Sequence, residues 1–212
     1  MFKNSAYLVL AIGTNIGKTH FVCLALKKNK KIKAIKPLIS GFVKQDENSD
    51  TAKIINAMGL ENNLKNIKKI SPWRFKKPLS PNFAGKVDYN SLLEFCQNAI
   101  DNAKSDNVKL LIEGAGGVLS PITNNETFLD LASDLKLPII LITSNYLGAL
   151  SHTISAIESI LNRHLKLKFV ILNDDCCGPI SDKNFINCLK KFTQNKVCNF
   201  KIIPIKNFIK KS

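Results

Sequence analysis

The sequence lacks the apolar runs and cysteine patterns that mark membrane proteins and disulfide-bonded secreted proteins. No segment of the 212 residues approaches the roughly 20 apolar residues that a membrane-spanning helix needs. Residues Met1–Ser5 pass directly into an apolar run and contain no signal-peptide cleavage region. The six cysteines form no Cys-x-x-Cys pair, which argues against a zinc site and a disulfide framework. We expect a cytoplasmic protein with reduced, mostly structural thiols.

Arginine is also scarce, and this scarcity argues against nucleic acid as a partner. Lys and Arg total 31 against 16 Asp and Glu, a formal charge of +15, yet arginine occurs only at Arg74 and Arg163. Nucleic-acid readers more often gather arginine with aromatic residues on one face, whereas the lysines here are scattered. We therefore expect no nucleic-acid binding, and a positive field that helps to recruit anionic small molecules.

Internal repeats and low-complexity linkers are absent, so we expect residues 1–212 to form a single domain. Apolar, strand-like runs alternate with helix-like segments, and residues 60–87 are the least regular part. This alternation predicts an α/β fold: a doubly wound, mainly parallel sheet with helices on both faces. We predict strands over 7–10, 32–36, 108–112, 138–143, 169–172 and 201–203, and helices over 21–26, 50–58, 88–103, 127–135, 147–162 and 182–192.

The first predicted strand leads into a segment typical of a phosphate-binding loop. Ala11–Thr19 ends in Gly17-Lys18-Thr19 and precedes a helix, so its backbone N–H groups and the helix dipole would face an anion. Lys18 would contact the outer phosphates and the Thr19 hydroxyl would bind Mg²⁺. The spacing is irregular, because Ile12 stands five residues before Gly17 where a glycine is usual. A tight strand-to-helix turn is the alternative interpretation.

Three charged residues fall where ligands bind in such sheets, at or beyond strand ends. Glu113 closes an apolar strand, where burying it unpaired would be costly, so it is a candidate Mg²⁺ ligand together with Thr19. Lys36 ends the second strand and would stabilise charge in phosphoryl transfer. Asp50 is a candidate second metal carboxylate. Each residue also has an ordinary structural interpretation. Glu113 could be solvated in a glycine-rich turn, the stem of Lys36 could pack on apolar surface with its ammonium in water, and Asp50 could simply begin a helix.

The chain as a whole resembles the dethiobiotin synthetase family. That family's loop reads approximately Gly-Thr-Asp-Thr-x-Val-Gly-Lys-Thr, and this chain keeps its second half, with Ala11, Ile12 and Gly13 replacing the first three residues. The resemblance runs in order from residue 7 to about 205 and includes Lys36–Gly41, Ser49-Asp50, Ser80-Pro81, Glu113–Gly117, Leu147-Gly148 and Asn173-Asp174. It implies the fold of the phosphate-loop NTPases.

The resemblance also implies an enzyme that closes the ureido ring of dethiobiotin from 7,8-diaminononanoate, CO2 and MgATP. Lys18 and Lys36 would be catalytic, and Mg²⁺ would be bound by Thr19, Asp50 and Glu113. Nucleotide binding would involve Thr14, Asn15, Ile16, Gly17, Lys18, Thr19, Glu113, Gly116, Asn173 and Pro204. The diamine and its carboxylate would contact Ser40, Gly116, Leu147, Gly148 and Ser151, the last three from a second subunit of a homodimer.

The predicted helix over 147–162 carries two apolar stripes, which agrees with a subunit contact. One stripe holds Leu147, Leu150, Ile154, Ile157 and Leu161, and a smaller one holds Ala149, Thr153, Ala156 and Ile160. We expect one stripe to cover the sheet and the smaller one to remain for a second subunit.

A partner-regulated ATPase of the kind that positions chromosomes or septa is the alternative function. Such proteins share this fold and a deviant Gly-Lys-Thr loop. They usually carry a second lysine early in that loop, and Ala11–Ile16 contains none. The three histidines show no ligand spacing, so we expect packing or surface roles for His20, His152 and His164.

Overall fold

A computed structural model describes residues 2–44, 46–173, 178–193 and 200–210. Its main sheet has six strands, all parallel, in the order β2-β5-β1-β6-β7-β8. Asp174 and three of the cysteines (Cys176, Cys177 and Cys198) lie outside the described residues. The strands are β1 (Ala6–Ala11), β2 (Ile32–Ile35), β5 (Lys109–Glu113), β6 (Ile139–Ser144), β7 (Leu167–Asn173) and β8 (Lys201–Pro204).

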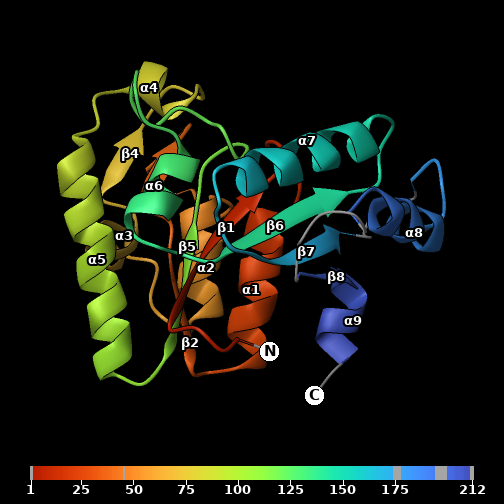
Figure 1. Ribbon diagram of the computed structural model, residues 1–212. Coiled ribbons are helices and arrows are strands. Elements are labelled where there is room, and N and C mark those ends of the chain that lie inside the picture. Colours follow the sequence, from red (N-terminus) through yellow and green to blue (C-terminus); the bar gives the residue numbers. More distant parts are fainter. Residues whose placement is uncertain (1, 45, 174–177, 194–199, 211–212) are drawn as a thin grey trace.

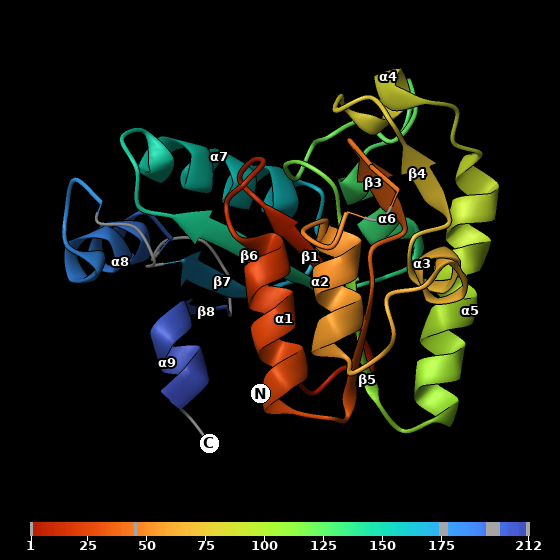
Figure 2. The same cartoon turned by 180° about the vertical axis from the view of Figure 1, so that it is seen from behind.

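Helices cover both faces of this sheet, as the alternating sequence pattern predicts (Figures 1 and 2). Helices α1, α2 and α9 lie on one face, and α6 and α7 lie on the other. Their bounds, with those of the remaining helices, are α1 (Lys18–Lys28), α2 (Asp50–Ala57), α3 (Leu64–Ile70), α4 (Pro81–Ala84), α5 (Tyr89–Ser105), α6 (Phe128–Asp134), α7 (Ala149–Asn162), α8 (Asp182–Thr193) and α9 (Ile205–Lys210). Within the described residues, no helix combines the length and apolar character needed to cross a membrane.

The strand register brings the predicted polar residues to one edge. Strands β1 and β6 are buried along their whole length, which explains why they read as continuous apolar runs. Val9 of β1 pairs with Glu113, so that carboxylate lies beside the start of the phosphate loop. Lys36 follows β2, which is hydrogen-bonded to β5. The carboxyl ends of β1, β2 and β5 thus converge, as ligand sites of parallel sheets require.

The segment 60–87 is more regular than its sequence indicates. Within it, strand β4 (Trp73–Phe75) pairs in parallel with β3 (Leu38–Ser40), which lies earlier in the chain and was predicted as loop. The two strands form a separate two-stranded sheet. Helices α3 and α4 were also not predicted. Three-residue strands are too short to show periodicity, and their pairing depends on residues more than 30 positions apart. This small sheet positions Ser40.

The prediction for the apolar stripes of α7 is wrong. Ala149, Thr153, Ala156 and Ile160 are buried within the fold, with Ala156 4% exposed, so the smaller stripe is the one that meets the sheet. Small side chains let the helix approach the strands closely, and the Thr153 hydroxyl lies 2.6 Å from that of Thr143 on β6. The larger stripe is partly exposed, and Leu147 just before the helix is 90% exposed.

Candidate functional site

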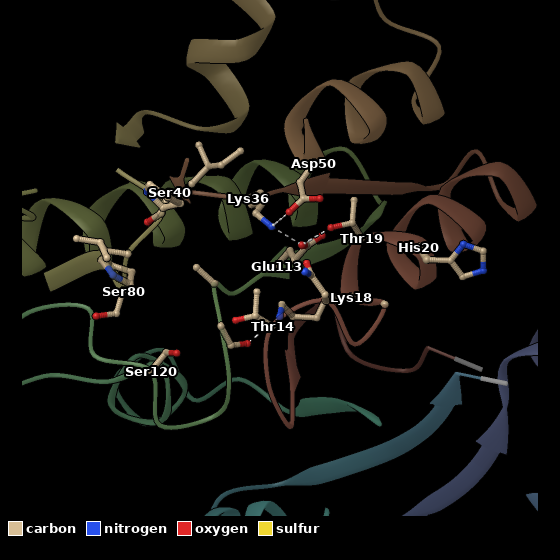
Figure 3. A pocket seen from close by; sticks show the side chains of 18 residues that line it. Thr14, Lys18, Thr19, His20, Lys36, Ser40, Asp50, Ser80, Glu113 and Ser120 are labelled. Carbon is tan, nitrogen blue, oxygen red and sulfur yellow. Dashed lines mark hydrogen bonds and ion pairs between the residues drawn. The ribbon is translucent and has the colours of Figure 1, made fainter. Parts of the chain in front are cut away.

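A cavity of about 430 Å³ lies beside the phosphate loop at the carboxyl ends of β1 and β5 (Figure 3). Its walls come from the loop, the first turn of α1, the end of β3, the start of α2 and the glycine-rich segment after β5. The lining residues predicted from the sequence are Thr14, Asn15, Gly17, Lys18, Thr19, Lys36, Ser40, Asp50, Glu113 and Gly116. The fold therefore gathers both predicted lysines and all three predicted metal ligands.

The phosphate loop has a backbone that only certain residues permit. Gly17 has φ +105°, and a Cβ there would lie 2.4 Å from the side-chain nitrogen of Asn173. Asn15 also lies in the left-handed region, which asparagine tolerates better than most residues. Helix α1 begins at Lys18 without a side-chain cap, so its first N–H groups stay available. The loop and helix terminus together form an anion-binding cradle.

Lys18 folds back over this cradle. Its Nζ donates hydrogen bonds to the carbonyl oxygens of Gly13, at 3.1 Å, and Gly116, at 2.7 Å. Burial lowers the pKa of Lys18 from 10.5 to about 8, although the Glu113 carboxylate acts in the opposite direction. Burial disfavours the protonated form of Lys18, and a bound phosphate would stabilise that form. The side chain is therefore suited to bind an anion.

Lys36 and two carboxylates form an ionic network next to Lys18. The Lys36 Nζ lies 2.5 Å from Asp50 Oδ2 and 2.6 Å from Glu113 Oε1. The Thr19 hydroxyl donates to the same Glu113 oxygen at 2.7 Å. Burial alone would lower the pKa of Lys36, but Glu113 and Asp50 raise it above its usual value. Burial would likewise raise the pKa of Asp50, but Lys36 lowers it, so the pair is ionised.

The oxygen atoms of this network suit Mg²⁺. Within the described part of the chain, Glu113 Oε2 is buried and has no hydrogen-bond partner. Thr19 and Asp50 bring a hydroxyl and a second carboxylate to the same network, and Mg²⁺ prefers such hard oxygen ligands. The described residues contain no group of three or more His, Cys, Asp or Glu side chains placed to hold a metal alone. Mg²⁺ would therefore need water and phosphate oxygens as further ligands.

The remaining nucleotide residues lie around the loop rather than in the cavity. Asn173, at the end of β7, donates from its amide nitrogen to the Ile16 carbonyl at 3.1 Å. Its amide oxygen is buried and finds no hydrogen-bond partner among the described residues. Pro204 ends β8, next to β7 in the sheet, and does not line the cavity.

The predicted substrate residues divide into two groups. Ser40 lies in the cavity, and its buried hydroxyl has no hydrogen-bond partner in the described ranges. Leu147, Gly148 and Ser151 are exposed around the start of α7 and do not line the cavity, so one chain does not bring them into it.

Sequence reasoning missed several lining residues. Ser80 and Ser120 reach the cavity from the start of α4 and from the segment after β5 (Figure 3). Ser80 belongs to the Ser-Pro pair already noted in the resemblance, which was a usable signal. His20 is exposed, in agreement with the expected surface position, and it also lines the cavity. Its position directly after Lys18-Thr19, in the first turn of α1, could have indicated this.

Comparison with known proteins agrees with this geometry. The chain matches the AAA domain family over residues 5–204. It is 33% identical to the ATP-dependent dethiobiotin synthetase BioD of Caulobacter sp. (strain K31), with 84% of this chain and 80% of that protein covered. It is 36% identical to the enzyme of the same name from Phenylobacterium zucineum (strain HLK1), with 80% and 76% covered.

A solved structure shows the same fold in a more distant protein. The MinC:MinD cell division protein complex of Aquifex aeolicus matches with a TM-score of 0.52 at 11% identity, covering 95% of this chain and 81% of that one. This likeness confirms the phosphate-loop NTPase fold and carries no functional argument. The sequence relatives and the family match over residues 5–204 decide the assignment, and the chain belongs to the dethiobiotin synthetase family.

Proposed function

We propose that this chain is an ATP-dependent dethiobiotin synthetase, which joins CO2 to 7,8-diaminononanoate and closes the ureido ring. The observation that carries the proposal is the cavity in which Lys18, the Lys36–Asp50–Glu113 network and the unpartnered Ser40 hydroxyl come together. Together these groups can hold a metal–triphosphate and a second, anionic reactant in one place.

The reaction has three steps, and each develops negative charge. One substrate amine attacks CO2 and loses a proton, giving a carbamate. A carbamate oxygen attacks the γ-phosphorus and ADP leaves, forming a carbamic–phosphoric anhydride. The second amine then attacks the carbamoyl carbon, phosphate leaves, and the ring closes. No covalent enzyme intermediate is needed, so positioning and charge stabilisation supply the rate.

The two lysines would act on different parts of this charge. Lys18, anchored on Gly13 and Gly116, is placed over the phosphate loop and would follow the phosphate oxygens. Lys36 lies deeper, between the carboxylates, and would stabilise the carbamate and the transferring phosphoryl group. Mg²⁺ would be held by Thr19, Asp50 and Glu113 and would neutralise phosphate charge.

The remaining residues would bind the ends of the substrates. Ser40 would hydrogen-bond to the carbamate or diamine through its unpartnered hydroxyl. The free amide oxygen of Asn173 would accept from the adenine amino group, with Pro204 as part of the adenine wall. We also propose a homodimer, in which Leu147, Gly148 and Ser151 of a second copy bind the substrate carboxylate.

Phosphate release that depends on the diamine tests the proposal against a regulated ATPase. The purified chain should release phosphate from MgATP only with diaminononanoate and bicarbonate present, and mass spectrometry should detect dethiobiotin in equal amount. Glu113→Gln should abolish both signals while leaving the diamine bound. ATP hydrolysis that proceeds without the diamine and yields no dethiobiotin would favour the switch-type ATPase instead.

A further inference from the structure

A second cavity, of about 910 Å³, lies at the amino ends of the strands, away from the phosphate loop. The first residues of β2, β5 and β8 line it, together with the end of α1 and helix α9. Figures 1 and 2 both place α9 beside α1. No residue lines both cavities. We call it the lysine cavity after its lining lysines, which are Lys3, Lys28, Lys31, Lys109, Lys168 and Lys201.

Most of the lysine charge around this cavity has no carboxylate partner among the described residues. Lysine supplies 6 of its 17 lining residues but only 29 of 212 in the chain, and no Asp or Glu lines it. Apart from Lys28, none of the six forms an ion pair with a described residue. Lys28 donates to the Phe208 carbonyl, and its ammonium lies 5.3 Å from the centre of the Phe208 ring. Lysines from separate elements therefore line one space that no described carboxylate lines, which favours a multivalent anion.

The same cavity has an aromatic floor. The half-buried Phe2 ring has its centre 5.2 Å from that of Tyr7 and 6.3 Å from those of Phe169 and Phe208. The other three rings are buried and tilted against Phe2, so Phe2 is the ring that offers an apolar surface to the cavity. An apolar ring with lysines around it suits a ligand that combines a planar ring with several negative charges. Amide side chains on the rim add hydrogen-bonding groups; they are Asn4, Asn29, Asn107 and Asn207.

We propose that the lysine cavity binds a nucleoside di- or triphosphate, as a second nucleotide site separate from the phosphate loop. The phosphates would contact the lysines and the base would lie against the Phe2 ring. A single carboxylate would neutralise only a small part of the lysine charge, whereas a triphosphate neutralises several ammonium groups. The volume of about 910 Å³ also falls within the range of roughly 300–1,000 Å³ found for small-molecule sites, which favours a mononucleotide over a polymer.

The test counts nucleotides bound per chain by isothermal titration with ATP and with GTP. The wild-type chain should bind two nucleotides. The triple variant Lys109→Gln/Lys168→Gln/Lys201→Gln should lose one, with the affinity of that site at least about tenfold weaker, since each charged contact is worth about that factor. A wild-type chain that binds one nucleotide only, or a triple variant that still binds two, would overturn the proposal.

A matched control removes the same charge elsewhere. Lys65→Gln/Lys68→Gln/Lys86→Gln changes three exposed lysines outside both cavities and should still bind two nucleotides. Loss of the second nucleotide in this control would mean that net charge alone is responsible, which contradicts a built site. With Lys18→Ala blocking the phosphate loop, one nucleotide should remain bound.

Two probes distinguish the ligand chemistry. Inorganic tripolyphosphate should compete with ATP for the lysine cavity but bind more weakly, because it lacks the base; equal affinity would overturn the assignment to nucleotides. A short single-stranded RNA that binds while mononucleotides do not would also overturn it. Dethiobiotin formation in the triple variant should stay within about twofold of wild type at saturating MgATP. The outcome is thus separable from the test of the proposed function.

Discussion

Lys36 lies between the carboxylates of Asp50 and Glu113, the same two groups that would bind a divalent cation. Lys36→Met keeps an unbranched side chain, shorter by its terminal atom, and leaves the Glu113 carboxylate, 1% exposed, without its cation. Removing one partner of a buried ion pair costs about 3–5 kcal/mol. We expect a lower melting temperature and a loss of turnover of at least about 100-fold. Thermal unfolding and product formation measure the two effects.

Metal binding gives this variant a second readout. Mn²⁺, added without nucleotide as a probe for Mg²⁺, should raise the melting temperature of Lys36→Met more than that of wild type, because the ion replaces the lost ammonium between the same oxygens. Lys65→Met, at an exposed position on α3, is the control and should respond as wild type does. An equal rise in melting temperature with Mn²⁺ in all three proteins would contradict the idea that the ion and the Lys36 ammonium occupy the same position.

Cys96 should be inert in the folded protein. It is fully buried on α5, and burial raises the pKa of its thiol from 9.0 to about 12. The native thiol therefore keeps its proton above pH 9, where the unfolded thiol loses it, so this residue's contribution to stability falls as pH rises from 9 to 12. Alkylation at pH 9, followed residue by residue with mass spectrometry, should modify the half-buried Cys188 well before Cys96. Similar rates for both thiols in the folded chain would refute this.

At the scale of elements, helix α7 supplies a matched pair of substitutions. Ala156→Glu places a charge between the helix and the sheet, where Ala156 is 4% exposed, and should unfold the chain at a cost above about 4 kcal/mol. Leu147→Asp changes a side chain that is 90% exposed and should alter stability by no more than about 0.5 kcal/mol. We expect Leu147→Asp to stay folded, with weaker dimerisation and diamine binding. Circular dichroism and sedimentation velocity distinguish the two; a folded, monomeric Ala156→Glu would show that the smaller stripe is the interface after all.

The same helix shows where sequence reasoning succeeds and where it fails. The spacing of apolar residues correctly predicts a helix and two stripes, because periodicity is a local property. Which stripe meets the sheet depends on how closely the helix packs, and the small residues Ala149 and Ala156 allow the closer approach. The pairing of β3 with β4 was missed for a related reason, since neither strand is long enough to show a pattern and each is defined by the other.

The site was predictable to a greater extent than these packing details. Lys36 and Glu113 stood at the ends of predicted strands, where a charge has no packing role, and the parallel topology brings such ends together. Asp50 stood at the start of a predicted helix, where an ordinary helix N-terminal role was an equal alternative. The ionic contacts of Lys36 with both carboxylates were not predictable, because they depend on side-chain reach across three elements. Ser120 was missed because its place depends on the turn that follows Gly116.

At the scale of the whole molecule, the distribution of lysine differs between sequence and structure. In the sequence the lysines are scattered, which led us to interpret the charge of +15 as a general field. In the fold, the amino ends of separate strands and the end of α1 bring six of them around one cavity, because parallel strands all begin at the same edge. The cavity beside the phosphate loop, at the other edge, has two lysines and two carboxylates among its lining residues.

The proposed dimer makes a prediction about two inactive variants. Lys36→Met removes the chemistry in a chain's own cavity, whereas Ser151→Asp adds a carboxylate in the first turn of α7, where a second copy would bind the substrate carboxylate. An acidic residue there suits the helix dipole, so the chain should still fold. Each variant alone should be inactive. Co-expression should restore about a quarter of wild-type activity, because half of the dimers are mixed and each mixed dimer keeps one intact site.

The control for this experiment is a pair of substitutions in the same cavity. In the proposed dimer, each active site takes its phosphate loop from one chain and α7 from the other. Lys36→Met co-expressed with Glu113→Gln should then show no recovery of activity, because both cavities of every dimer are defective. Turnover is measured as dethiobiotin formed per chain in the unfractionated mixture; tandem purification through a different tag on each variant isolates the mixed dimers and should raise the recovery to about half. If Ser151→Asp alone is fully active, or if its mixture with Lys36→Met shows only the activity of the parents, then the start of α7 in a second subunit is not part of the substrate site.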